Sequence, residues 1–294
     1  MPVEQYTPTP IARDAGERPV ALVLGAGGAH GLAHIGVLKV LRAQRVPIDL
    51  IVGASMGSLI GAGLAAGYTP EQMERDAART PWLQLFTEFD LRGPGLLKMD
   101  RIRGRLDQVF GDLTFDRLQV PLAVVAASFK TGALVVLREG RVADAVLASI
   151  AIPLIFPPVP CGEDVLVDGG VLAPVPVEVA RQLGARRIIA VDAAVDPPPA
   201  PLRHPRVAHL VRRFAEPLLA RARAAGRLTR SAIACFVLYT LASSPFAPVQ
   251  ADVVIKPSYG RISMNDYHRA DQLVRLGELA AWLALPQLRS LGER

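Results

Sequence analysis

The sequence is poor in cysteine, aromatic residues and lysine. Its 294 residues contain two cysteines, Cys161 and Cys235, in no CxxC pair, so we expect free thiols in a reducing compartment. Aromatic residues make up 5% of the chain, and the formal net charge of +6 is dispersed. Nucleic-acid binding usually needs a concentrated basic face with stacking aromatic side chains, so we expect no nucleic-acid partner. Dispersed positive charge fits either general solubility or weak attraction to anionic lipid headgroups.

Long apolar runs are also missing. The one membrane-like stretch, residues 232–242, is well short of the roughly 20 residues that span a bilayer. We expect a buried core helix there, with an interfacial anchor as the alternative. Residues 1–19 form a flexible leader with acidic and proline residues and no apolar run, unlike a signal peptide. These absences predict a cytoplasmic protein, with peripheral attachment to the inner membrane face as a further option.

Short apolar segments separated by turns are abundant instead. Apolar residues make up 51% of the chain and charged residues 20%, which is the composition of a folded protein rather than a disordered one. The run at residues 20–24 is typical of a strand buried on both faces, and residues 32–44 have helical spacing. Residues 48–52 resemble another strand, followed by a helix of small residues at 58–66. This alternation predicts an α/β fold with a mostly parallel central sheet.

Residues 68–118 differ from the segments around them. They are richer in charge and contain helix-like pieces at 70–79 and 100–110, so we expect a helical cap inserted between strands. We predict one domain over residues 20–285, followed by a C-terminal tail at 286–294. The remaining strands are expected at residues 121–127, 133–137, 165–167, 187–191 and 252–255, and the last amphipathic helix at 266–285.

The segment Gly53-Ala54-Ser55-Met56-Gly57 has the pattern Gly-x-Ser-x-Gly and stands between an apolar strand and a helix-forming stretch. A nucleophile elbow requires this context, because its tight turn leaves no room for side chains two residues before and after the serine. The helix that begins there points backbone N–H groups at developing negative charge. We therefore predict Ser55 as a nucleophile. The alternative is a glycine-rich turn with an N-capping serine.

A second glycine-rich turn, residues 25–31, also leads from a strand into a helix. Backbone amides in such a turn can bind a phosphate or an oxyanion. Gly25, Gly27 and Gly31 are one residue too widely spaced for the dinucleotide-binding fingerprint, and the acidic residue expected after the second strand is missing. A nucleotide-binding oxidoreductase is therefore a weak alternative, and half of an oxyanion hole fits better.

A serine nucleophile needs a general base. Asp168 is the best candidate, because it ends an apolar strand and is followed by Gly169 and Gly170, which let the chain turn without covering the carboxylate. We expect it at the same carboxyl edge of the sheet as Ser55, and the alternative is an ordinary turn. Structural and substrate-contact roles compete for the first two histidines, and the other three have no supporting motif. The five are His30, His34, His204, His209 and His268.

Taken together, these segments resemble the patatin-like phospholipases, and among them the compact bacterial branch. The resemblance covers about residues 20–285 and rests on the glycine-rich turn, Gly-x-Ser-x-Gly and Asp-Gly-Gly in that order. Residues 148–158 and 251–257 add to it. It implies a three-layer α/β/α sandwich with a mostly parallel central sheet, and a serine–aspartate dyad without histidine.

The resemblance also implies a role for each motif. Ser55 would be the acylated nucleophile, and Asp168 its general base and later its general acid. The oxyanion hole would consist of the Gly27 and Gly28 amides, assisted by the Met56 N–H. The protein would then be a serine esterase that cleaves acyl esters of phospholipids or lysophospholipids at a peripheral membrane surface, without a metal or an organic cofactor. The glycines that support these turns would be Gly25, Gly31, Gly53, Gly57, Gly169 and Gly170.

Three positions depart from the family pattern. His30 stands where many members have arginine, so we expect a contact with substrate phosphate there that is weaker or pH-dependent. Ala173 replaces an asparagine that is common in close relatives, and Ala26 stands where strict glycine spacing would place glycine. The loss of polar support at Ala173 is the one hint of a lipid-binding or regulatory protein with little turnover, which is the alternative function.

Overall fold

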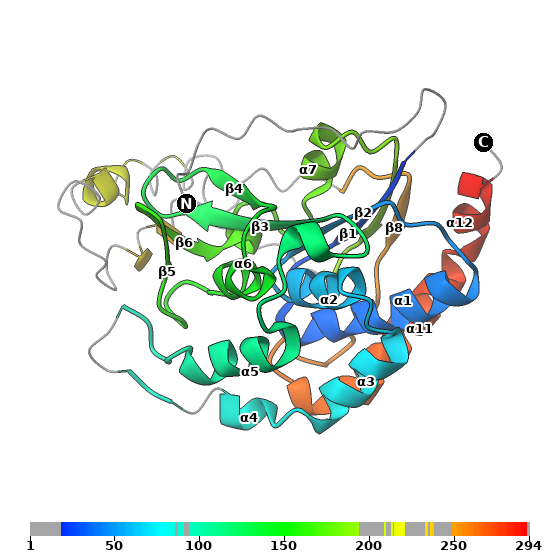
Figure 1. Cartoon of the computed structure of the whole chain (residues 1–294), viewed down its shortest axis with the longest axis horizontal. Helices are drawn as coiled ribbons and strands as arrows, with labels where there is room; N and C mark the ends of the chain where they lie inside the picture. Colours follow the sequence, from blue (N-terminus) through cyan, green and yellow to red (C-terminus); the bar gives the residue numbers. More distant parts are fainter. Residues whose placement is uncertain are drawn as a thin grey trace.

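The computed structural model describes residues 19–85, 88–90, 94–193, 209, 213, 215–220, 233–234, 236–237 and 249–292 (Figure 1). Within these residues an eight-stranded sheet has the order β5-β6-β3-β2-β1-β7-β8, and β4 pairs with β3. The five strands β1, β2, β3, β7 and β8 are parallel, whereas β4 and β6 pair antiparallel with β3, and β5 with β6. The strands are Val20–Leu24 (β1), Leu50–Ala54 (β2), Leu122–Ser128 (β3), Leu134–Leu137 (β4), Val159–Cys161 (β5), Asp164–Asp168 (β6), Arg187–Val191 (β7) and Val253–Ile255 (β8).

The strand β1 is apolar throughout because both of its faces are covered. Leu22 and Leu24 contribute to one hydrophobic cluster, while Ala21 and Val23 contribute to a second, and all four are fully buried. Successive strand residues point to opposite faces, so a continuous apolar run means helices on both sides of the sheet. The expected α/β sandwich with a mostly parallel sheet is confirmed.

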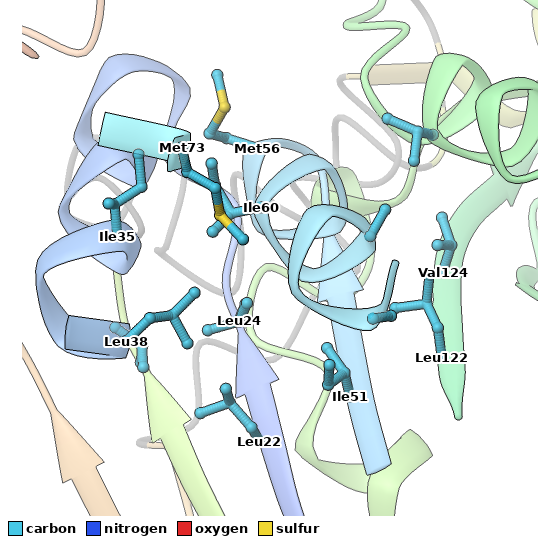
Figure 2. Close-up of a cluster of buried hydrophobic side chains, with 14 of the residues drawn as sticks. Leu22, Leu24, Ile35, Leu38, Ile51, Met56, Ile60, Met73, Leu122 and Val124 are labelled. Carbon is cyan, nitrogen blue, oxygen red and sulfur yellow. The ribbon is translucent and has the colours of Figure 1, made fainter. Parts of the chain in front are cut away.

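One face of the sheet is covered by four helices that meet the larger cluster. They are α1 (Ala33–Ala43), α2 (Met56–Ala65), α6 (Val142–Ser149) and α11 (Ala270–Leu283). Figure 2 shows Ile35 and Leu38 of α1 beside Leu22 and Leu24 of β1, with Ile60 of α2 next to them. Burial of apolar surface between these helices and the sheet stabilises the fold at roughly 25 cal/mol per Å² removed from water.

The helices α1 and α11 approach each other closely through two glycines. A Cβ atom on Gly36 would lie 1.9 Å from Val274 O, and one on Gly277 would lie 1.9 Å from Ala33 O. Side chains at these positions would therefore collide with backbone. This contact anchors the C-terminal part of the chain on the helix that follows the glycine-rich turn.

The opposite face carries α7 (Val177–Gln182) and a smaller third cluster. In that third cluster Ile233 and Phe236 are fully buried, and the Phe236 ring lies 5.4 Å from the Phe129 ring, centroid to centroid. These two residues agree with a core position for the stretch at 232–242. The rest of that stretch, apart from Ala234 and Val237, lies outside the described residues. No helix in the described part of the chain is long and apolar enough to cross a bilayer.

The segment predicted as a cap contributes three helices on the side of α1 and α2. The helix α3 (Pro70–Arg79) packs on α1, α2 and α11, whereas α5 (Asp100–Phe110) packs on α6, and the short α4 (Trp82–Leu85) lies between them in the chain (Figure 1). Thr69 and Gln72 form a reciprocal capping box that starts α3. The bounds of α3 and α5 agree with the helix-like pieces expected at 70–79 and 100–110.

Most observed bounds lie within a few residues of the expected ones, and two differences stand out. The second strand starts at Leu50 rather than at residue 48, because Asp49 is held at the strand entrance, where its carboxylate accepts from Val20 N–H at 2.8 Å. At the other end of the chain, residues 285–292 form the helix α12 (Leu285–Gly292), in which Leu288 is buried, where the sequence suggested a tail. Of the expected leader at 1–19, residues 1–18 lie outside the described residues.

Candidate active site

Ser55 and Asp168 lie opposite each other because the strands β2 and β6 pair with β3 in matching register, one on each side. Ala54, the last residue of β2, pairs with Val125 of β3, and Asp168, the last residue of β6, pairs with Ala126. The two side chains therefore meet across the middle of β3. The expected proximity is present, but its cause is different. The strand β6 is antiparallel, so Asp168 does not stand at a shared carboxyl edge of parallel strands.

Ser55 joins β2 directly to α2 in a strained backbone conformation. Its φ is 52° and its ψ is −124°, values that residues other than glycine rarely adopt. The turn is tight, since a Cβ atom on Gly57 would lie 2.1 Å from Leu24 O and one on Gly53 would lie 2.5 Å from Ser58 Cα. The Gly-x-Ser-x-Gly pattern is thus explained by the lack of space at both glycines.

Further hydrogen bonds hold this strained residue. Ser55 N–H donates to Ser149 Oγ at 2.9 Å, and the Ser149 hydroxyl donates to Val125 O at 2.7 Å. Ser58 Oγ–H donates to Ser55 O at 2.6 Å. Ser149 and Ser58 are fully buried, so these bonds are shielded from water and restrain the turn from both sides.

The Ser55 hydroxyl donates to Asp168 Oδ2 at 2.6 Å, which is short for an O–H···O bond and typical of a charged acceptor. The other carboxylate oxygen, Oδ1, accepts from Gly170 N–H at 2.7 Å. Both Ser55 and Asp168 are 5% exposed. Burial raises the pKa of Asp168 from 3.8 to about 6, against the opposing effect of the hydrogen bonds from Ser55 and Gly170. The carboxylate is thus ionised at neutral pH and more basic than an exposed one.

Space around the Asp-Gly-Gly turn is also restricted. A Cβ atom on Gly169 would lie 2.4 Å from Val125 O, and one on Gly170 would lie 2.7 Å from Ala26 Cβ. The methyl group of Ala26, one of the departures noted above, therefore occupies space that the glycine at 170 leaves open. At the other departure, Ala173 donates its N–H to Gly169 O at 2.9 Å, so the turn retains backbone support without an asparagine.

The glycine-rich turn presents backbone N–H groups beside Ser55. The amides of its flanking residues are used within the fold: Gly25 N–H donates to Val191 O, and Ala29 N–H donates to Met264 O. Among the described residues no acceptor is found for the N–H groups of Gly27 and Gly28. Gly28 has a φ of +55° and lines the same pocket as Ser55. The arrangement can therefore bind negative charge that develops next to the Ser55 hydroxyl.

His30 of this turn and His34 at the start of α1 each have a ring nitrogen close to a backbone carbonyl. His30 Nε2 lies 2.8 Å from Ile262 O, and its ring stacks on Tyr259 with 3.8 Å between centroids. The ring is 7% exposed and is not part of the pocket lining, so the structure gives no support for the predicted contact with substrate phosphate. His34 Nε2 lies 2.8 Å from Gly25 O, and burial lowers its pKa to about 4. His34 is thus neutral at physiological pH, and its Nε2–H donates to Gly25 O and holds the start of the turn.

The two other histidines that the structure describes supply no base for Ser55. His209 and His268 are exposed, and His204 lies outside the described residues. Throughout the described part of the chain, the acceptor found for the Ser55 hydroxyl is Asp168. In the same part, no three His, Cys, Asp or Glu side chains converge as metal ligands.

An apolar pocket of about 150 Å³ opens from Ser55 between α2, α3, α4 and α5. Its charged lining residues, Asp76 and Arg105, are partly or largely exposed and belong to the outer rim. Figure 2 shows Ile60 of α2 and Met73 of α3 beside each other where these helices meet. Apolar members of the lining are Met56, Leu59 and Ile60 from α2, Met73 and Ala77 from α3, Trp82 and Leu85 from α4, and Ile102, Leu106 and Phe110 from α5.

Two features of the site were not predicted from the sequence. The pocket is assembled from many separate segments, four helices among them, and no single segment carries a pattern that distinguishes it from ordinary core. Ser149, which fixes Ser55 N–H, lies within residues 148–158, a segment noted for its resemblance but without a role for the serine. Ser149 directly follows the apolar run at residues 145–148, and a lone hydroxyl at the end of such a run is the signal that could have indicated it.

Comparisons with known proteins identify relatives of this chain. A family model described as "Patatin-like phospholipase" matches residues 22–181, more than half of the 294 residues. Patatin-like phospholipase domain-containing protein 6 of Homo sapiens is 34% identical over 189 residues, which are 62% of this chain and 14% of that protein. An NTE family protein of Mycobacterium tuberculosis is 33% identical over 190 residues, which are 63% of this chain and 52% of that protein. The chain thus matches about half, or less, of the length of these relatives.

The solved structure of VipD from Legionella pneumophila has a similar fold. It superposes with a TM-score of 0.57 at 13% sequence identity, covering 94% of this chain and 67% of that chain. Fold and site together define a class of three-layer α/β proteins with a serine on a strand-to-helix turn. Within this class, the chain belongs to the patatin-like phospholipase family. The family expected from the sequence is therefore confirmed.

Proposed function

We propose that the protein is a serine acyl hydrolase that cleaves acyl esters of phospholipids or lysophospholipids with a dyad of Ser55 and Asp168. The observation that carries this proposal is the 2.6 Å hydrogen bond from Ser55 Oγ to Asp168 Oδ2, at the inner end of an apolar pocket. A nucleophile within hydrogen-bond reach of a base that is itself oriented by a third group is the pattern of covalent catalysis. Here the third group is Gly170 N–H.

In the acylation step, Ser55 Oγ attacks the ester carbonyl carbon while its proton moves to Asp168 Oδ2. The carbonyl oxygen becomes an oxyanion, to which the Gly27 and Gly28 amides donate, assisted by the Met56 N–H at the start of α2. Collapse of this intermediate breaks the bond to the leaving alcohol, which takes the proton from Asp168. The acyl group stays on Ser55 as an ester.

Deacylation repeats these events with water as the nucleophile. Asp168 removes a proton from water, the resulting hydroxide attacks the acyl-serine, and Ser55 leaves with the proton that Asp168 returns. The carboxylate must be ionised for both steps. Because its pKa is about 6, we expect kcat/KM to fall about tenfold per pH unit below pH 6.

Lipid esters fit this site because the pocket beside Ser55 is almost entirely apolar. Side chains of leucine, isoleucine, methionine and tryptophan, most of them from α2, α3, α4 and α5, form its walls. Burial of an acyl chain there is favourable by about 0.8 kcal/mol per methylene group. Pockets that bind small molecules are typically lined by apolar side chains, with a few polar groups that fix the orientation of the ligand.

We also propose that the protein acts at a membrane surface, in the cytoplasm and peripheral to the inner face. Three large apolar side chains are exposed on two neighbouring loops. Phe89 is 71% exposed and Leu96 45% in the segment between α4 and α5, and Ile155 is 38% exposed in the segment after α6. Leu96 N–H donates to the carbonyls of Leu154 and Ile155, which places these loops side by side. Exposed apolar side chains that gather in one place favour an interface with another apolar surface.

Release of fatty acid from lysophosphatidylcholine and phosphatidylcholine vesicles tests the proposal. We expect Ser55→Ala to abolish release while circular dichroism and the melting temperature remain those of the wild type. Ser290→Ala, which changes an exposed serine of α12, should leave release unchanged. Turnover that persists in Ser55→Ala contradicts the nucleophile. Binding of vesicles by wild type and Ser55→Ala alike, without release by either, identifies the alternative, a lipid-binding or regulatory protein.

A further inference from the structure

The far end of the apolar pocket is closed by a thin wall. Tyr68, Val109 and Phe110 line the apolar pocket, and the same three residues line a second, outer hollow of about 460 Å³. The outer hollow is polar, since Gln72, Asp112 and Arg117 belong to its lining. One layer of side chains therefore separates an apolar space that leads to Ser55 from a polar hollow on the surface.

A hydrogen bond holds this wall together. The Tyr68 hydroxyl donates to Val109 O at 2.8 Å, and this bond joins the loop after α2 to the end of α5. The backbone of Tyr68 is fixed as well, because its N–H donates to Gly63 O at 3.0 Å. Gly67, the residue before it, has a φ of +93° and packs tightly on Gln119. The ring is thus held in position from the backbone and from its hydroxyl.

The wall lies at a defined distance from Ser55. The helix α2 starts at Met56, next to Ser55, contributes Leu59, Ile60 and Gly63 to the pocket, and ends at Ala65. Its 10 residues extend about 15 Å at 1.5 Å per residue. This is close to the length of an extended dodecanoyl chain. An acyl chain attached to Ser55 and lying along α2 would reach Tyr68 with its last carbons.

We propose that Tyr68 is the specificity residue that limits acyl-chain length in this pocket. The inference rests on the proposed function, because it takes the pocket as the acyl-binding site. Chains up to about the length of α2 end against the Tyr68 ring. Longer chains must displace it and break its bond to Val109 O. Removal of the ring would join the two cavities and let the end of a longer chain pass into the outer hollow.

The experiment compares kcat/KM for p-nitrophenyl butanoate, octanoate, dodecanoate and hexadecanoate. We expect Tyr68→Ala to raise the ratio of hexadecanoate to octanoate about tenfold over the wild type, the effect of burying roughly two further methylene groups. Tyr68→Phe keeps the ring without the hydroxyl and should raise the ratio less. Arg117→Ala changes an exposed residue of the outer hollow alone and should leave the ratio unchanged.

A binding measurement keeps the test independent of turnover. Dodecanoate and hexadecanoate are titrated into Ser55→Ala and into Ser55→Ala with Tyr68→Ala, with Trp82 in the pocket lining as the fluorescent reporter. We expect Tyr68→Ala to strengthen binding of hexadecanoate relative to dodecanoate. A loss of general stability would not shift this ratio, so a merely structural role for Tyr68 is separated from a role in selectivity.

The outcomes distinguish this inference from the proposed function. Unchanged chain-length ratios in Tyr68→Ala, in rates and in binding, overturn the inference while ester hydrolysis by the wild type still supports the dyad. A shifted binding ratio in a protein that hydrolyses no ester upholds the inference about the pocket and contradicts the enzyme. Absence of saturable fatty-acid binding to every variant overturns the assignment of the pocket itself.

Discussion

The two ends of the candidate site are built on different principles. At the polar end, around Ser55 and Asp168, position is set by backbone: register across β3, buried hydrogen bonds, and glycines where a Cβ would collide with main-chain atoms. At the apolar end, the pocket is set by side chains from four helices, among them the adaptable Met56 and Met73. The polar end leaves little freedom for substitution, whereas the apolar end can change shape while the fold is kept. We infer that the reaction depends on the polar end and that the selectivity for the acyl chain depends on the apolar end.

The largest effect is expected at the carboxylate of the polar end. Asp168→Asn should lower kcat/KM for a short-chain ester on the order of a thousand- to ten-thousand-fold, because the amide cannot accept the Ser55 proton. Fatty-acid binding in the apolar pocket should remain that of the wild type. Steady-state kinetics measure the loss of kcat/KM, and a fatty-acid titration measures the binding. A variant with both activity and binding impaired would mean that the two ends are not separable.

The glycine-rich turn should be nearly as sensitive. Gly28→Ala places a Cβ 2.7 Å from Met264 O at a residue with a φ of +55°, so the amide must move. We expect a loss of about a hundred- to a thousandfold in kcat, the effect of removing an oxyanion-hole donor. Gly104→Ala in α5 is the matched control, since a Cβ there meets nothing within 4 Å, and it should add about 1 kcal/mol of stability. Full activity in Gly28→Ala would remove this amide from the oxyanion hole.

The buried carboxylate should cost stability at neutral pH. Asp168 has a pKa of about 6 in the folded protein against 3.8 for an exposed group, so the folded state binds more protons between these values. The free energy of unfolding therefore falls as pH rises through this window. We expect Asp168→Asn to be more stable than the wild type by up to about 3 kcal/mol at pH 8 and equally stable near pH 3.

Urea unfolding of the wild type and Asp168→Asn at several pH values checks this difference. Burial of His34 acts in the opposite direction, since its lowered pKa adds stability as pH rises from about 4 to 6.5. This contribution is present in both proteins and cancels in the comparison. A difference that does not vary with pH would show that the carboxylate is not desolvated as the structure indicates.

A smaller effect is expected in the middle of the apolar pocket. A Cβ on Gly63 would lie 3.2 Å from the flexible end of Met73, so Gly63→Leu pushes the Met73 side chain aside and extends into the pocket that both residues line. We expect the ratio of kcat/KM for dodecanoyl to butanoyl esters to fall about tenfold, with the butanoyl rate changed little. An equal loss for both esters would mean that short and long chains use the same part of the pocket.

Much of the fold could be predicted because its elements carry local signals. The strands β1 and β7 and the helix α3 are found where the apolar runs at 20–24 and 187–191 and the helix-like piece at 70–79 placed them. The helix α6 was not predicted. Nearly all of its residues are buried, so the polar face that reveals a helix in a sequence is missing. Short elements such as β5 and α7 have too few residues for a period to show.

In the candidate site, too, some features have a local signal in the sequence and others do not. Ser55, Asp168 and the glycines could be predicted because a tight turn requires particular residues at fixed spacing. The antiparallel direction of β6 could not, since pairing between distant strands leaves no local mark. The same holds for the pocket and for Ser149, whose role arises only when α6 packs beside Ser55. His30 was expected to contact substrate, but its ring is occupied by Ile262 O and Tyr259.

The most direct test of the account is covalent labelling with a fluorophosphonate, followed by intact-mass measurement of the wild type, Ser55→Ala and Asp168→Asn. We expect one adduct on the wild type, none on Ser55→Ala, and strongly slowed labelling of Asp168→Asn, because the reagent reacts with a serine that is activated by its base. An unlabelled wild type that is folded and binds fatty acid, or equal labelling of the wild type and Ser55→Ala, would contradict the claim that this pair forms a catalytic dyad.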